Sequence, residues 1–349
     1  MTMKNIRLSV LDQSPVRKGV TASRAVQETV ELAKLTDSLG YTRFWVSEHH
    51  NTGSLAGSTP EVLIAHLGSQ TKNIRLGSGG IMLPNHSALK VSENFRMLEA
   101  LYPGRIDLGM GRAPGTDRIT ASVLNPSNKF SEQDFVEQLM DLQNYFHDTA
   151  ETGPVAAKIR AIPQVDTVPG MWLLSSSGQS SLFAAHFGMG FSFAHFINPV
   201  GGAQAVELYR ARFQPSADLP QPEANVAIFA FCSEDEEKLR QHQAVMDYRF
   251  LQFEKGGGIV PLSYEDVKDA EYTAQDLERI RMNRRRVITG TPGQMKDIIT
   301  RLANTYNVDE VMLVTIAEDF DDRLKSYELI AQQFELPVPK QDFNEAIIL

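Results

Sequence analysis

Short apolar runs alternate with longer amphipathic stretches along almost the whole of this chain of 349 residues. Eight runs have the length of a β-strand, at residues 6–11, 43–46, 74–76, 106–110, 171–174, 190–194, 226–231 and 310–315. Helix-length stretches lie between them, at residues 22–39, 60–71, 87–101, 131–146, 180–187 and 202–213. This repeat predicts a parallel sheet with right-handed crossovers, because each helix must return the chain to the same end of the sheet.

Two closures fit such an α/β repeat, an eight-stranded (β/α)8 TIM barrel and a doubly wound open sheet. Eight units in 349 residues favour the barrel, and we predict a single barrel domain over residues 1–349. Two segments interrupt the repeat: residues 147–170, rich in Pro, Gly and Thr, and residues 233–306, which are too long for one crossover. The second is predicted as an insertion with a helix near residues 234–254. Its glycines at 256–258, within residues 255–285, fit either a mobile lid or an ordinary surface loop.

The overall charge argues against a nucleic-acid-binding protein. The chain has 43 acidic and 34 basic residues, whereas affinity for nucleic acid depends on clustered Lys and Arg. The one basic cluster, the five arginines at positions 279, 281, 284, 285 and 286, is interpreted as a solvated or ion-paired helix face rather than a phosphate site. The single cysteine, Cys232, excludes intramolecular disulfides and multi-cysteine metal sites. We find neither a signal peptide nor a membrane-length apolar stretch and expect a cytoplasmic protein.

In a barrel, the loops that follow the strands build the active site, and the second strand ends in the unusual sequence FWVSEHHN. Its Glu48, His49 and His50 are interpreted as functional rather than as ordinary hydrogen-bonded strand-end residues. If the strand continues to this point, alternation should keep His49 and His50 from both facing one site, which weakens a two-histidine metal site. The sequence contains neither His-x-His nor His-Glu-x-x-His, and no metal site is predicted.

The third strand leads into GSGGIMLPNH, residues 77–86. Gly79 and Gly80 have no side chains, so the backbone there could approach a flat ligand closely or simply form a bulge. The fourth strand leads into DLGMGRAPGTD, whose glycine spacing is one residue too long for a dinucleotide fingerprint. Arg112 in this loop instead suits an anion such as phosphate.

The fifth strand is followed by SSSGQSS, residues 175–181, at the start of a predicted helix. Hydroxyl groups, a glycine and free backbone N–H groups at a helix start form a phosphate cradle. N-capping by Ser177 or Ser180 is the alternative, but one serine would satisfy it. Taken together, the loops predict an anchored phosphate, a side-chain-free platform and a histidine or glutamate near the reactive end. Flavin mononucleotide (FMN), which carries its own redox chemistry, meets that description.

The motifs GYTRFWVSEHHN, IRLGSGGIMLPNH, GRIDLGMGRAPGTD and DEVMLVT, in this order and spacing, resemble the signatures of the bacterial luciferase-like flavin-dependent monooxygenases. The resemblance covers nearly the whole chain and is closest to the non-luminous, unassigned oxidoreductases of that family. It implies a (β/α)8 barrel that binds FMN at the carboxyl ends of its strands. The family's luciferase carries a cysteine where Gly111 stands, so light emission is not expected.

The same resemblance implies roles for individual residues. Glu48 would lie beside the flavin, His49 would serve in acid–base chemistry with His50 as its neighbour, and His86 matches a family histidine. The strand-three turn under the flavin ring often contains a non-prolyl cis peptide in this family. The expected cofactor-binding residues are Ser78, Gly79, Gly80, Arg112, Ser175, Ser177, Gly178 and Ser180.

The function expected from this resemblance is that of a two-component monooxygenase acting on a small organic substrate. A separate flavin reductase would supply reduced FMN, O2 would be the second substrate, and the family implies a homodimer. A deazaflavin-dependent dehydrogenase or reductase of the same fold and a non-catalytic flavin-binding protein are the alternatives. Metal-dependent hydrolysis has little support in the sequence.

Overall fold

The computed structural model describes residues 5–127, 129–149, 159–258 and 260–339. Its strands are β1 (Arg7–Asp12), β2 (Arg43–Val46), β3 (Arg75–Met82), β4 (Ile106–Gly111), β5 (Gly170–Ser175), β6 (Gly190–Ala194), β7 (Ala224–Cys232), β8 (Val287–Gly290) and β9 (Glu310–Val314). All of them pair in parallel, and β1 to β7 together with β9 form a closed ring of eight. The predicted (β/α)8 barrel is therefore confirmed, and the open sheet is excluded.

A ninth strand, β8, lies inside the segment that the sequence predicted as an insertion. Phe229 of β7 pairs with Val287 of β8 and also with Val314 of β9, so β8 extends the sheet along the edge of β7 opposite β9. The prediction of eight strands missed this element. Its four residues, VITG, follow a run of arginines, and only the first two of them are apolar, so they do not stand out as an apolar run.

The helices are α1 (Ala22–Ser38), α2 (Pro60–Gln70), α3 (Ala88–Leu101), α4 (Arg118–Leu124), α5 (Glu132–His147), α7 (Gln179–His186), α8 (Gly202–Arg212), α9 (Glu236–Glu254), α10 (Ala274–Asn283), α11 (Pro292–Tyr306) and α12 (Phe320–Phe334), with short 3-10 turns η1 (Leu83–Asn85) and η2 (Tyr264–Asp266). All six predicted helices are present, and so is the helix expected near 234–254. The predicted excursion at 147–170 lies partly outside the described residues. No helix in the described part of the chain has the length and apolarity needed to span a bilayer.

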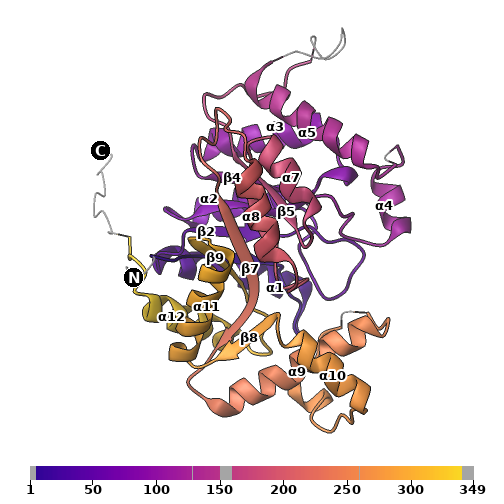
Figure 1. The fold of residues 1–349 in the computed structure, drawn as a ribbon, viewed down its shortest axis with the longest axis vertical. Helices are drawn as coiled ribbons and strands as arrows, with labels where there is room; N and C mark the ends of the chain where they lie inside the picture. The colour runs from indigo at the N-terminus through magenta and orange to yellow at the C-terminus, as the bar shows by residue number, and fades with distance from the viewer. Residues whose placement is uncertain (1–4, 128, 150–158, 259, 340–349) are drawn as a thin grey trace.

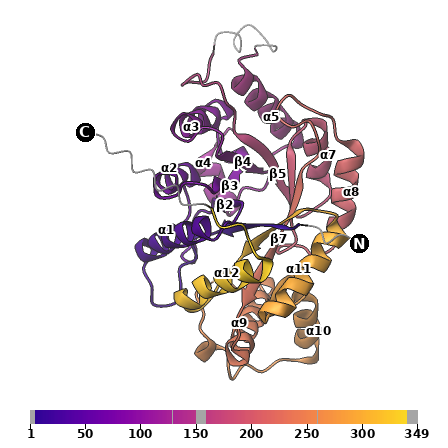
Figure 2. The same ribbon diagram turned by 90° about the vertical axis from the view of Figure 1, so that its left-hand side faces the viewer.

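Helices α9 and α10 project from one end of the molecule, on the side opposite α3 and α5 (Figures 1 and 2). Four of the five clustered arginines are ion-paired and the fifth, Arg285, is exposed, in agreement with the predicted solvated or ion-paired surface. Arg279 and Arg286 bind the carboxylate of Glu254, and Arg284 binds Asp247 at 2.6 Å. Cys232 is buried, and burial raises the pKa of its thiol to about 12, so it behaves as a small core residue.

Apolar side chains cover both faces of the barrel strands, as parallel sheets require. Leu8, Val10 and Phe44 belong to the large cluster that packs against the surrounding helices. A second, smaller cluster includes the alternate residues Leu11 and Trp45 and fills the interior of the barrel.

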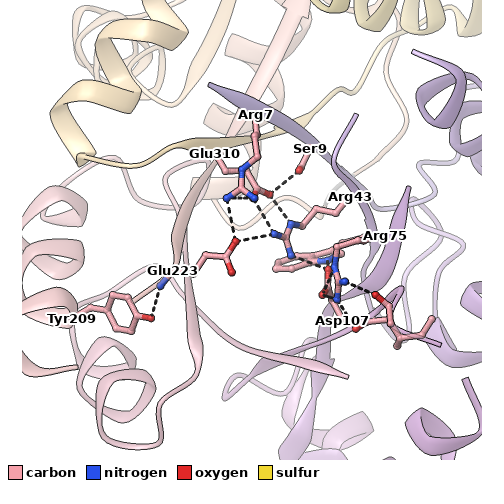
Figure 3. Close-up of polar contacts among 11 residues, drawn as sticks. Arg7, Ser9, Arg43, Arg75, Asp107, Tyr209, Glu223 and Glu310 are labelled. Carbon is pink, nitrogen blue, oxygen red and sulfur yellow. Dashed lines mark hydrogen bonds and ion pairs between the residues drawn. The ribbon is translucent and has the colours of Figure 1, made fainter. Parts of the chain in front are cut away.

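The amino-terminal end of the barrel interior holds a network of charged side chains, which we call the basal network: Arg7, Ser9, Arg43, Arg75, Asp107, Glu223 and Glu310 (Figure 3). Arg43 lies at its centre and is almost fully buried, with its side chain 4% exposed. Its Nε donates to Glu310 at 2.7 Å, and its Nη1 donates to Asp107 at 2.9 Å. Burial opposes the charge on Arg43, but the surrounding carboxylates outweigh it and raise the pKa of the guanidinium.

The basal network is connected to an aromatic layer directly above it. Trp45 donates from Nε1 to the Asp107 carboxylate at 3.0 Å and packs edge-on against Trp172, with ring centroids 5.5 Å apart. The Arg43 guanidinium lies 4.6 Å from the centre of the Trp172 ring, within cation–π range. The charged network therefore fixes the position of the indole rings that form the next layer toward the carboxyl ends of the strands.

Candidate functional site

A cavity of about 380 Å³, which we call the inner cavity, opens above the Trp45 layer at the carboxyl ends of the strands. Its apolar wall includes Leu11, Trp45, Met82, Leu174, Phe196 and Met312. Its polar wall includes Gln13, His49, Arg112, Ser175, Ser176, Ser177, Ser180 and Ser192. Loops that follow several strands thus meet at one end of the barrel, where such folds place their active sites.

The end of β2 divides its unusual residues between two environments. Trp45 and His49 line the inner cavity, whereas Glu48 is fully buried beside it. β2 ends at Val46, so strand alternation does not reach the two histidines, but only His49 lines the cavity, and His50 turns to Glu48. His49 keeps a hydrogen bond between its Nδ1 and the Ser47 hydroxyl at 3.1 Å, which leaves Nε2 available to a bound molecule.

Glu48 forms the centre of a cluster behind the cavity. Its carboxylate binds the Nε2 atoms of His50 and His86 at 2.8 and 2.9 Å, and it accepts the backbone N–H of Met82 at 2.8 Å. Met82 itself lines the cavity. Three of the four residues predicted as catalytic therefore form one cluster that holds the end of β3, while the fourth, His49, lies apart on the cavity wall.

The charges in this region follow from burial and hydrogen bonding. Burial alone would raise the pKa of Glu48, but the hydrogen bonds with two histidines and the Met82 N–H outweigh it and lower the pKa. Burial also opposes the charged form of His86, yet its bond to Glu48 raises the pKa of that imidazole. Burial lowers the pKa of His49 below its ordinary value of 6.5, so its neutral form predominates at neutral pH.

We expect His49 to titrate below pH 6.5 and His86 to titrate above it. Two-dimensional NMR of protein with 15N-labelled histidine would give both midpoints, and His49→Asn and His86→Asn variants would assign the signals. The prediction fails if His49 holds its proton through pH 6.5, because burial without a strong carboxylate partner cannot produce that result.

Gly79 and Gly80 both line the inner cavity and are joined by a cis peptide bond, as the resemblance implied. A Cβ on Gly80 would come within 2.6 Å of the Gly109 carbonyl oxygen, and one on Gly79 within 2.6 Å of a Leu11 methyl group. The pairing of β3 with β4 also shifts register between Gly79 and Ile81. The bulge is therefore observed, whereas the close approach of a flat ligand to this wall stays a prediction.

Arg112 and the serines after β5 line the same wall of the cavity, at the start of α7. Arg112 donates to the Gln179 side chain at 2.8 Å and lies 3.5 Å from the Glu132 carboxylate. Ser175 accepts the backbone N–H of Ser177 at 3.1 Å, which closes a tight serine turn. A guanidinium, several hydroxyls and a helix start together could hold a phosphate group.

Two predicted cofactor residues do not line the inner cavity. Ser78 is fully buried and donates its hydroxyl to the Gly109 carbonyl at 2.8 Å, so it joins β3 to β4. Gly178 is the residue before α7, and its carbonyl accepts the Ser181 hydroxyl at 2.6 Å. Conversely, the sequence predictions omitted Gln13 and Ser192, which do line the cavity. Gln13 directly follows β1, and its place after a predicted strand was the available signal.

No group of three or more His, Cys, Asp or Glu side chains with the geometry of a metal site occurs in the described ranges. The combination found at the inner cavity is different. It has a cationic and hydroxyl-rich end, a wall without side chains, an aromatic floor and one neutral histidine.

Residues 6–307 match the family model described as luciferase-like monooxygenase. YwcH of Bacillus subtilis is 47% identical to this chain over 94% of its length and 99% of the relative. The N-acetyl-S-alkylcysteine monooxygenase of the same organism is 36% identical and covers 93% of this chain and 97% of its own. The crystal structure of apo-MsnO8 superposes with a TM-score of 0.86 at 34% identity and covers 97% of this chain and 100% of its own.

More distant structures share the fold alone. The oxygenating constituent of a 3,6-diketocamphane monooxygenase from Pseudomonas putida, solved with FMN, has a TM-score of 0.68 at 19% identity and covers 96% of this chain and 100% of its own. An F420-dependent secondary alcohol dehydrogenase has a TM-score of 0.67 at 12% identity and covers 95% of this chain and 99% of its own.

Proposed function

The chain belongs to the luciferase-like monooxygenase family, and we propose that it is an FMN-dependent monooxygenase that works with a separate flavin reductase. The observation that carries this proposal is the convergence of Arg112, the β5 serines and the Gly79–Gly80 backbone on one cavity. We also propose that the protein acts in the cytoplasm as a homodimer, in line with the family resemblance.

The residues of the inner cavity fit FMN. Arg112 and the hydroxyls of Ser175, Ser177 and Ser180 would hold its phosphate, and the glycine pair would face its ring, since no Cβ occupies that wall. When bound in its reduced form, FMN supplies the electrons that activate O2. The remaining work belongs to the protein.

The protein would position the reactants, exclude water and move a proton. The apolar wall, which includes Leu11 and Met312, keeps water away from one side of the cavity. His49, neutral at neutral pH, can accept a proton at Nε2 while Ser47 orients its ring through Nδ1. Glu48 does not line the cavity and acts instead as a positioning residue, because it fixes the backbone of Met82 at the end of β3.

The substrate is proposed to be a small organic molecule. Because a relative that is 36% identical over 93% of the chain is named an N-acetyl-S-alkylcysteine monooxygenase, such thioethers are the first compounds to test. The inner cavity has apolar walls suited to an alkyl group, and its volume of about 380 Å³ limits the size of what can enter together with a flavin ring.

Two measurements test the function. FMN, and not the deazaflavin F420, should raise the thermal unfolding temperature of the purified protein, because a ligand raises that temperature only if it binds the native state. With reduced FMN, O2 and N-acetyl-S-alkylcysteines, mass spectrometry with 18O2 should then find one labelled oxygen in the product. Stabilisation by F420 alone, with substrate turnover in the absence of O2, would favour the dehydrogenase. Binding of FMN with release of only hydrogen peroxide under every substrate would favour a non-catalytic flavin protein.

A further inference from the structure

A second and larger cavity, of about 610 Å³, lies outside the first, and we call it the outer cavity. It is enclosed by the end of β7, the residues that follow β9 and the inward side of α9, the helix that projects with α10 from the barrel (Figure 1). Its apolar surface comes from Phe231, Val245, Met246, Leu262 and Ile316. The cavity therefore lies where α9 meets the barrel.

The two cavities lie along the same strand, and none of the described residues lines both. Ala227 of β7 lines the inner cavity, and Phe231 lines the outer cavity. These two residues lie on the same face of β7, four positions apart, which corresponds to about 13 Å along a strand. Phe229, which lies between them, belongs to the barrel-interior cluster. Met246 of α9 belongs to the same cluster, and Ile316 packs against it. One apolar wall thus runs from the inner cavity outward to α9.

Arg249 of α9 lines the outer cavity and has no ion-pair or hydrogen-bond partner among the described residues. Its Nε is buried without an acceptor. Burial lowers the pKa of the Arg249 guanidinium, the direction expected of a cation with no carboxylate opposite it. Arg249 is partly buried, and an uncompensated charge in such a position is costly, so a ligand that supplies the missing anion would bind favourably.

The other cations beside this cavity already have partners. Lys18 is ion-paired with Asp266, and Lys238 is ion-paired with Asp322. The neighbouring His242 stacks on Phe231 and hydrogen-bonds the Ile316 carbonyl through Nε2. Burial lowers the pKa of His242 to about 4, so it remains neutral at neutral pH.

The acidic residues of the wall are engaged as well, and none of them binds Arg249. Glu318 accepts the backbone N–H of Tyr264 at 2.7 Å, and Asp319 accepts the N–H of Asp322 at the start of α12. Glu265 is paired with Lys268. Arg249 is therefore the available charge in a cavity that is otherwise apolar or internally neutralised.

We propose that the outer cavity binds the carboxylate of the substrate through Arg249, with the apolar part of that substrate lying along the β7 wall toward the inner cavity. The inference rests on the proposed function, and it names the substrate class as small carboxylic acids with an apolar or thioether body. Guanidinium forks match carboxylate oxygens in geometry. In this assignment Arg249 selects the substrate and takes no part in proton transfer.

Isothermal titration calorimetry with octanoate, octan-1-ol and octylamine tests the site without knowledge of the natural substrate. Octanoate should bind the wild-type protein more tightly than octylamine. The Arg249→Met variant should bind octanoate at least about tenfold more weakly, because a charge-assisted hydrogen bond is lost while the apolar stem is kept. The same variant should bind octan-1-ol as the wild type does, which also shows that the cavity is intact.

Arg240 provides the matched control, since it lies on the same helix with its side chain 72% exposed and outside the cavity lining. Arg240→Met should leave octanoate binding unchanged. Equal octanoate affinity in Arg249→Met and wild type, or no octanoate binding to the wild type, would overturn the proposal. FMN titrated into the same preparations tests the proposed function separately. Failure of the protein to bind FMN would contradict the assignment as an FMN-dependent monooxygenase. A loss of octanoate binding confined to Arg249→Met would still establish the carboxylate site.

Discussion

Replacing Arg43 with methionine should lower the free energy of unfolding by about 3 to 5 kcal/mol, the usual cost of removing one partner from a buried ion pair. The methionine would fill part of the space but remove the cation shared by the fully buried carboxylates of Asp107 and Glu310. Asp107 would keep only Arg75 as a cationic partner, and Glu310 would keep only the half-exposed Arg7, at 3.5 Å. It would also remove the guanidinium that packs on Trp172. Chemical denaturation followed by far-UV circular dichroism measures the effect.

The matched control is Arg7→Met. Arg7 belongs to the same basal network, but its side chain is 44% exposed, so we expect a change of at most about 1 kcal/mol. Equal losses of unfolding free energy in the two variants would show that the burial of Arg43 does not increase its contribution to stability.

The pH dependence of Arg43→Met gives a second signature. Burial would raise the pKa of Asp107, but Arg43 and Arg75 outweigh it and lower the pKa below the ordinary value of 3.8. The wild type therefore gains stability that is complete above pH 3.8 and is lost as the pH falls through the lower pKa of the folded state. Without Arg43, Asp107 keeps one of its two arginine partners, Arg75, so its pKa should be higher than in the wild type and the variant should lose less stability in acid. The difference between the two proteins should narrow in acid.

Replacing Arg112 with methionine should weaken FMN binding by about tenfold to a hundredfold, the range expected when a charge-assisted contact to a phosphate is lost. Riboflavin lacks the phosphate, so its weaker binding should change little. The loss of flavin fluorescence or a shift of its absorbance on titration measures both affinities. The comparison of the two flavins separates a phosphate contact from general damage to the cavity.

Arg118→Met is the control for this experiment, because Arg118 is exposed at the first turn of α4 and does not line the inner cavity. It should bind both flavins as the wild type does. If Arg112→Met weakens FMN and riboflavin to the same extent, the phosphate does not lie at Arg112, and the orientation of the flavin in the proposed site is wrong.

The sequence by itself determined the barrel and the end of it that carries the site. Short apolar runs and helical stretches with apolar residues at a period of 3.6 are local patterns, and they predicted eight strands and six helices close to their observed bounds. Since parallel strands all end on the same side, residues that follow different strands had to converge, and Arg112, Ser177, Gly79 and His49 do line one cavity.

Only the tertiary structure decided which side chains meet and which stay alone. His86 binds Glu48 from 38 positions away, and Arg43 binds Glu310 from 267 positions away. No local pattern contains those pairings, because they depend on strand register and on the depth at which each side chain is buried. That Arg249 has no partner within the described ranges is likewise a property of the packed molecule, since an unpaired charge is found only from the positions of the residues around it.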